Sequence, residues 1–270
     1  MDKYFICLAN SYKHGGRCIA GVELELKDSR WRIVRDDRGM PKWIRPVLRY
    51  SASGKIPNVI AIGISTLDVV CIEGVEACPV GAQVENVYFS NMYVTGKRYD
   101  ASLKLLERFT DDSHLHIFYN YGKAVTPEIY QNLGTQSIIL IHALDAEVYI
   151  KETYTDNPRY RVRFSYHSHV YDFPITDPDY IKDIRSGRKS VGCKQQLFIT
   201  CSLGVKHEGW HPKLAACVFE VEHDAWDSSN IHPANFSYET HEGGTNENVV
   251  KETDNGISRF EWIVKWFRRR

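Results

Sequence analysis

The stretch FICLANSYKH, residues 5–14, has a counterpart near the end of the chain, FITCSLGVKH, residues 198–207. Each stretch is followed by a glycine, Gly16 or Gly209, and then by a strand of small residues. Matching apolar alternation around a Lys-His turn favours an internal repeat over a chance likeness, and such a repeat sets the architecture.

The repeat predicts two equivalent hairpins, residues 3–26 and 196–222, in two separate barrels. In that superposition Lys13 lies over Lys206, as Gly16 lies over Gly209.

The composition is that of a globular protein. The chain has 270 residues, a hydrophobic fraction of 43%, and 34 basic against 34 acidic side chains, which excludes a uniformly basic nucleic-acid wrapper. No run of 18 apolar residues occurs, so we expect no membrane span. The start, MDKYFICLAN, has no signal-peptide pattern, and a cytoplasmic location is expected.

The seven cysteines are odd in number and form no CxxC motif. This usage is typical of buried thiols in a reducing compartment, with no disulfide, no metal and no other cofactor.

Most segments are predicted to be strands. Short strands with turns between them, interrupted by only three short helices, indicate a mainly β protein of small barrels. Strand patterns cover residues 3–9, 17–26, 31–35, 58–64, 68–74, 83–93, 137–143, 147–153, 159–173, 196–202 and 214–222. Helix signals cover residues 99–109, 126–134 and 176–187.

These patterns predict four parts. They are a first barrel with two short helices (1–135), a second barrel (136–222), a polar linker or loop (223–258) and an aromatic, basic tail (259–270). The tail carries Trp262, Trp266 and Phe267, which we expect either to dock on the body or to bind a partner.

The main candidate for binding is a basic ridge on the segment from Arg159 to Tyr171. Side chains alternate along a strand, so one face should carry a row of cations and rings. These residues are Arg159, Arg161, Arg163, His167, His169 and Tyr171. Arginine binds phosphate and planar rings stack on bases, which favours a nucleic-acid ligand. The alternative is a solvated face paired with acids such as Glu147 and Glu152.

Two further groups carry clustered cations. In the first, arginines alternate with aromatic residues, and Arg32, Trp43 and Arg45 are candidates for single-strand binding, or else parts of a surface loop. In the second, the two Lys-His turns predict either a phosphate or nucleotide cradle or plain turn chemistry. The turn residues are Lys13, His14, Arg17, Lys206, His207 and Lys213.

Catalytic motifs are few: the sequence has no P-loop, GxSxG or HExxH pattern. Asp111 and Asp112 before His114 and His116 leave a nuclease as an alternative.

The opening hairpin, the segment YDFPITDP (171–178), the later hairpin and the closing RFEW resemble a bacterial family of dual OB-containing domain proteins. The resemblance covers most of residues 1–222 and the tail, and it implies two OB-like barrels and an association with prokaryotic defence loci. It carries no catalytic residue.

Together, these observations predict two tandem OB-like barrels that bind single-stranded nucleic acid or a nucleotide, as a subunit of a prokaryotic defence assembly with protein partners. A protein–protein interaction module without nucleic acid is the first alternative, and an enzyme is the second.

Overall fold

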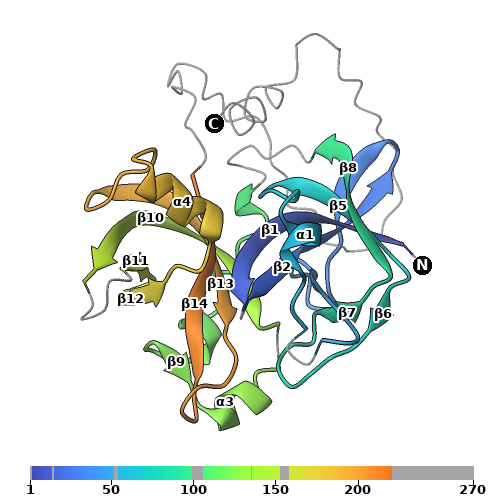
Figure 1. Ribbon diagram of the computed structural model, residues 1–270. Coiled ribbons are helices and arrows are strands. Elements are labelled where there is room, and N and C mark those ends of the chain that lie inside the picture. The colour runs from blue at the N-terminus through green and yellow to red at the C-terminus, as the bar shows by residue number, and fades with distance from the viewer. Residues whose placement is uncertain are drawn as a thin grey trace, which may run out of the picture. The chain divides into compact units, whose positions relative to one another are not determined.

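The computed structural model describes residues 2–13, 15–51, 54–98, 106–134, 136–152 and 158–220. The chain divides into a compact unit of residues 1–221 and a second unit of residues 222–270, which lies outside the described residues. The predicted linker and tail, with Trp262, Trp266 and Phe267, therefore also lie outside them. The described strands form two sheets (Figure 1).

The first sheet contains the N-terminal strands, in the order β6-β7-β4-β2-β1-β5-β8 with β3 paired to β2. Its elements are β1 (Lys3–Lys13), β2 (Gly16–Lys27), β3 (Arg30–Ile33), β4 (Trp43–Val47), α1 (Asn58–Ala61), β5 (Asp68–Glu73), β6 (Glu76–Ala77), β7 (Asn86–Tyr88) and β8 (Asn91–Arg98).

Two residues separate β7 from β8, and the two strands have different partners. β7 runs parallel to β4, whereas β8 runs antiparallel to β5. They act as one bent strand that links both edges of the sheet, so the sheet curls into a first barrel. Its core includes Phe5, Ile19, Ile44 and Val70.

The second sheet has the order β12-β11-β10-β13-β14-β9. Its elements are η1 (Ile117–Tyr119), β9 (Ala124–Val125), α3 (Pro127–Gln131), β10 (Ile138–Lys151), β11 (Arg159–Tyr166), β12 (His169–Pro174), α4 (Pro178–Arg185), β13 (Lys194–Leu203) and β14 (His211–Phe219). A parallel bridge from Ile175, just after β12, to Ala215 in β14 joins the two strands, and Thr176 N donates to Ala215 O at 2.9 Å. This bridge closes a second barrel.

The two barrels have the same topology. β1, β2, β4, α1, β5 and β7–β8 in the first correspond to β10, β11, β12, α4, β13 and β14 in the second. In both, strand 1 pairs with strands 2 and 4, and strand 5 pairs with strand 3 in parallel and with strand 4 antiparallel. This is the order of an OB-type Greek-key barrel. The predicted fold class, mainly β with two tandem OB-like barrels and a few short helices, is confirmed.

The predicted superposition of the two Lys-His hairpins is wrong. β1–β2 forms strands 1 and 2 of the first barrel, whereas β13–β14 forms strands 4 and 5 of the second. The two hairpins also bulge on opposite strands, at Leu8 in β1 and at Ala216 in β14. Their sequences are alike because both hairpins are buried along most of their length.

Two local predictions also need correction. Residues 58–61 form the short helix α1 instead of a strand, and Val59 and Ile60 are exposed. Pro57 precedes the helix, where its fixed φ and missing N–H are tolerated. The run 159–173 is a hairpin: β11 and β12 join at His167-Ser168, where His167 has a φ of 49°.

The other helix signals agree with the structure where it is described. Thr126 caps α3 by accepting from Ile129 N, and Asp177 caps α4 by accepting from Asp179 N and Tyr180 N. The helix predicted over residues 99–109 lies mostly outside the described residues.

The segment between the barrels packs on the second core. Ile117, Phe118, Val125 and Leu133 belong to that core together with Phe164. The domain boundary at residue 135 stays a prediction, and these contacts would place it earlier in the chain.

The two barrels contact each other through the look-alike hairpins. Thr200 Oγ1 in β13 donates to Leu8 O in β1 at 2.6 Å, and Tyr12 N donates to Thr176 O at 2.8 Å. Buried strands therefore face each other across the junction, which accounts for the apolar content of both hairpins.

Candidate nucleic-acid interface

The outer face of β11 carries a row of basic side chains. Tyr160, Val162, Phe164 and Tyr166 alternate with them and are buried in the second core. Arg159, Arg163 and Ser165 are exposed on the opposite face, and Arg161 is half-buried there. The alternation predicted for this strand is confirmed between residues 159 and 166.

The other half of the predicted ridge lies elsewhere. Because the chain reverses at His167, Tyr171 pairs with Phe164 and His169 pairs with Tyr166, on the core side of the hairpin. Tyr171 is buried, and His169 is half-buried. His167 is exposed at the turn, where its Nε2 lies 3.1 Å from Asp112 O. One continuous row from Arg159 to Tyr171 is therefore not formed.

Acids on the flanking strands meet the arginines. Arg161 Nε donates to Asp172 Oδ1 at 2.8 Å, and Arg161 Nη2 donates to Asp172 O at 2.8 Å. Arg163 lies 3.9 Å from the Glu147 carboxylate, and its guanidinium lies 5.1 Å from the centre of the Tyr149 ring. Burial would raise the pKa of Asp172, but hydrogen bonds from Arg161 and Tyr149 outweigh it and hold that pKa below its usual value.

The outer face of β11 and its neighbours nevertheless carries a net positive charge. Five cations lie on or beside it, Lys123, Lys151, Arg159, Arg161 and Arg163, against three carboxylates, Asp145, Glu147 and Asp172. Arg161 and Arg163 are held by acids, whereas the described residues supply no ion pair for Arg159 or Lys151. Exposed guanidinium forks beside a tyrosine ring can bind a phosphate and stack on a base.

The second basic group does not gather at the surface. Arg32 is exposed on β3 and pairs with Asp28 at 3.1 Å. Trp43 and Arg45 are both buried, and the Arg45 guanidinium forms a 2.7 Å ion pair with Glu85. Because both side chains are buried, they cannot contact a nucleic-acid strand bound at the protein surface.

The turn cations fall into two classes. Arg17 and Lys213 are buried: Arg17 Nη1 donates to Asn10 O, and Lys213 Nζ donates to the carbonyl oxygens of Ile117 and Asn120. Both buried cations are satisfied by hydrogen bonds to main-chain carbonyl oxygens, and neither is accessible to a ligand.

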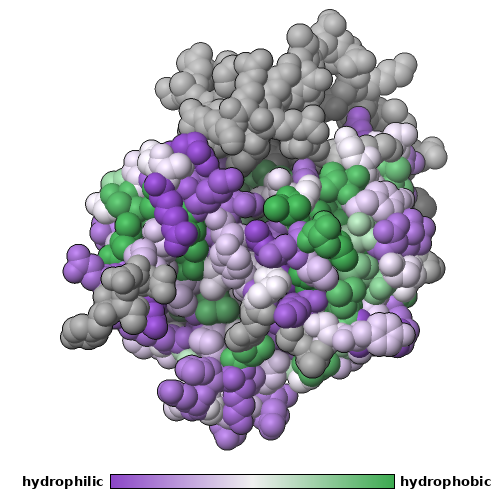
Figure 2. All heavy atoms as spheres, viewed as in Figure 1, coloured by the Kyte–Doolittle hydropathy of each residue, from purple (hydrophilic) through white to green (hydrophobic). Residues whose placement is uncertain are grey.

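Lys206 and His207 are exposed in the loop between β13 and β14. Figure 2 shows hydrophilic side chains gathered at the bottom of the view, where this loop and α3 lie in Figure 1. Lys13 ends β1 and is half-buried, and His14 lies outside the described residues.

The structure adds a group of rings beside β12. Tyr121 lies 5.3 Å from His169 and 5.7 Å from Tyr171, and His116 lies 4.5 Å from His169, between ring centres. Tyr121 is 59% exposed, so it offers a free ring edge next to strand 3 of the second barrel. Alternating rings in the sequence 114–121 were the available signal, but only the fold brings them to β12.

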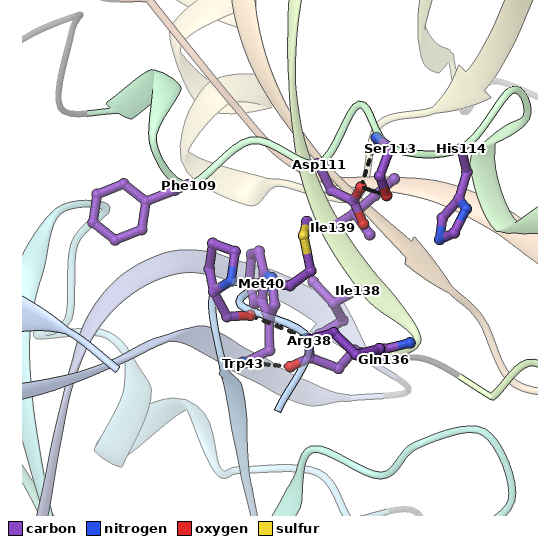
Figure 3. Close-up of a pocket in the computed structure, with 11 residues that line it drawn as sticks. Arg38, Met40, Trp43, Phe109, Asp111, Ser113, His114, Gln136, Ile138 and Ile139 are labelled. Atoms are coloured by element: carbon purple, nitrogen blue, oxygen red, sulfur yellow. Dashed lines mark hydrogen bonds between the residues drawn. The ribbon is translucent and has the colours of Figure 1, made fainter. Parts of the chain in front are cut away.

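A cavity of about 210 Å³ lies between Trp43 and Met40 of the first barrel and Ile138 of β10 (Figure 3). Its polar groups already have partners. Gln136 accepts from Trp43 N and donates to Pro41 O, and Asp111 accepts from Ser113 N and Oγ. Gln136 thus fastens the two barrels together, and Asp111, a candidate of the nuclease alternative, serves as a turn residue.

Among solved structures, the chain is similar to the crystal structure of the p204 HINb domain and to a murine DNA binding protein bound with ds DNA. The first is 7% identical with a TM-score of 0.34, and the second is 6% identical with a TM-score of 0.31. Each match covers 81% of this chain and 95% of the other. None of the curated proteins compared with the chain matches it. The model of the dual OB-containing domain matches residues 3–218, and the chain belongs to this family.

Proposed function

We propose that the protein binds nucleic acid across the outer face of the second barrel, on β11 and its neighbours. One observation carries the proposal: the exposed arginines lie on strand 2 of an OB-type barrel. OB barrels bind oligonucleotides on the face of strands 2 and 3. No described helix is long and apolar enough to cross a membrane.

Each side chain has a distinct role in this proposal. Arg159 and Arg163, both exposed, contact phosphates. Arg161 is fixed by its two bonds to Asp172 and positions that part of the face. Tyr149, partly covered by Arg163, and Tyr121 beside β12 provide rings for bases. Single-strand preference, a nucleotide as ligand, protein partners and a role in a defence assembly stay predictions.

The test is oligonucleotide binding by Arg159→Glu/Arg163→Glu, measured by fluorescence anisotropy over a range of salt concentrations. We expect binding at least tenfold weaker and a log–log salt slope shallower by roughly 1.4, which corresponds to two single-strand phosphate contacts. Stability should change by less than about 1 kcal/mol, because both side chains are exposed.

The matched control is Lys182→Glu/Arg188→Glu, which makes the same change in net charge on and just after α4. It should leave the salt slope unchanged. If the β11 variant binds as tightly as the wild type, or no more weakly than the control, the β11 face is a structural face and the interaction-module alternative replaces this proposal. Arg161 is left intact, because replacing it would leave the half-buried Asp172 without its partner.

A further inference from the structure

A second cavity lies between the two look-alike hairpins and shares no residue with the β11 face. Its volume is about 180 Å³. The first barrel contributes Tyr12, Lys13 and Arg45, and the second contributes Leu203, Val205 and Leu214. Most lining residues come from the ends of β1 and β2 in the first barrel and from β13, β14 and the loop between them in the second.

Arg45 supplies an incompletely bonded guanidinium. The side chain is 1% exposed, and its Nη2 contacts Glu85 Oε1 at 2.7 Å and Ser137 Oγ at 3.0 Å. Its Nε has no hydrogen-bond partner among the described residues. A buried donor without an acceptor is costly, and it indicates a place where an acceptor can bind.

Lys13 adds a second cation to the same cavity. The described residues provide neither a hydrogen bond nor an ion pair for its ammonium. Burial lowers the pKa of Lys13, the nearby Arg45 lowers it further, and Cys18 opposes the change. No carboxylate contributes to this shift.

Glu85, the carboxylate that pairs with Arg45, is already occupied. Glu85 Oε1 accepts from Ser137 Oγ and Arg45, and Glu85 Oε2 accepts from Ser137 N. The Arg45–Glu85 pair is neutral as a whole, so the cavity keeps the positive charge of Lys13. A partly desolvated cation without a counter-charge favours an anion.

One wall of the cavity is apolar, and Ser11, Gln83 and Ser202 add uncharged polar groups elsewhere. Leu203 and Ala216 are buried, Leu214 is half-buried, and Val205 lies at the rim with 44% of its surface exposed. An apolar cavity of about 150 Å³ is large enough for one benzene ring. From the charge, the unpaired donor and this volume, we propose that the cavity binds a small organic anion with a phosphate or carboxylate head and a body of about one ring.

Calorimetric titration with phenyl phosphate tests the proposal on the full chain, with inorganic phosphate and benzyl alcohol as half-ligands. We expect phenyl phosphate to bind at least tenfold more tightly than either half-ligand, because it matches both the cation and the apolar wall. Lys13→Met keeps the apolar stem and should weaken binding at least tenfold. Val205→Trp should block the rim and abolish binding.

The matched control is Lys206→Met, the exposed lysine three residues after Leu203, which does not line the cavity. It should bind phenyl phosphate as the wild type does, and so should Arg159→Glu/Arg163→Glu. Absence of binding by the wild type, or equal binding by Lys13→Met and Lys206→Met, overturns the proposal. Loss of binding in the β11 variant would also overturn it, because the site would then be the nucleic-acid face.

Discussion

Lys213 has no exposed surface, and its Nζ donates to Ile117 O and Asn120 O at 2.6 Å each. Burial lowers its pKa to about 8, an effect that Cys201 opposes. We expect Lys213→Met to leave both carbonyl oxygens unpaired and to reduce the free energy of unfolding by roughly 2–4 kcal/mol. Urea unfolding followed by circular dichroism measures this loss. An unchanged midpoint would mean that the lysine does not support the segment 117–120.

Asp177 is the N-cap of α4 and is also buried. Burial raises its pKa to about 6, although hydrogen bonds from Tyr180 N and Val218 N partly offset the effect. The folded state therefore holds a proton more tightly than the unfolded chain does. The resulting stabilisation is complete below the unfolded pKa of about 3.9 and is lost as the pH rises through 6.

The change amounts to about 2 kcal/mol between pH 4 and 7 for a shift of this size. Urea unfolding at several pH values, compared between the wild type and Asp177→Asn, isolates it from other groups. The wild type should lose stability relative to the variant as the pH rises. A difference between the two proteins that stays constant from pH 4 to 7 contradicts this assignment.

At the scale of elements, the close antiparallel pairing of β1 with β2 beside the Leu8 bulge depends on Gly21. A Cβ at this position would lie 1.8 Å from Ile6 O and 2.7 Å from the Phe5 ring. We expect Gly21→Ala to reduce the free energy of unfolding by about 3 kcal/mol or more, because main chain must move to admit it. Gly63→Ala is the control, since a Cβ there would meet nothing within 4 Å. In thermal unfolding, Gly21→Ala should have a clearly lower Tm than Gly63→Ala. Equal Tm values would argue against the close packing at Gly21.

The elements also show what the sequence can and cannot predict. Alternation located β11, and the caps Thr126 and Asp177 located α3 and α4, because those signals depend on neighbouring residues alone. Apolar content could not distinguish α1 from a strand, since Val59 and Ile60 are exposed on a single helical turn. The alternating run 159–173 continued through His167, where a positive φ reverses the chain without a glycine to mark it.

The candidate site, like the fold, was predicted only where local sequence signals decide the structure. Residue type and spacing identified Arg159, Arg161 and Arg163 as one face, and Glu147 as a partner. The bond between Arg161 and Asp172 depends on the pairing of β11 with β12, and Tyr121 reaches that hairpin only through tertiary packing. The two Lys-His hairpins have similar sequences because both are buried at the junction of the barrels. This similarity therefore did not indicate that they occupy equivalent positions in the two barrels.

At the scale of the whole molecule, a buried ion pair in the first barrel is hydrogen-bonded to the second barrel through Ser137. Arg45 lies on β4 and Glu85 just before β7, both in the first barrel, and Ser137 lies just before β10 of the second. Glu85 accepts from both Arg45 and Ser137, so its carboxylate connects the two cores. Breaking a buried pair leaves an uncompensated charge, at a cost of about 3–5 kcal/mol.

We therefore expect Glu85→Ala to destabilise both barrels together. Hydrogen exchange should become faster in β5 and in β11, because neither barrel keeps its packing surface when the other opens. Arg45→Met/Glu85→Met should recover much of the loss, since it removes both charges and keeps apolar volume. Breaking the exposed pair with Glu147→Gln gives the baseline, a change of less than about 1 kcal/mol. If exchange in β11 stays at the wild-type rate while β5 loses protection, the barrels fold independently and the ion pair stabilises the first barrel alone.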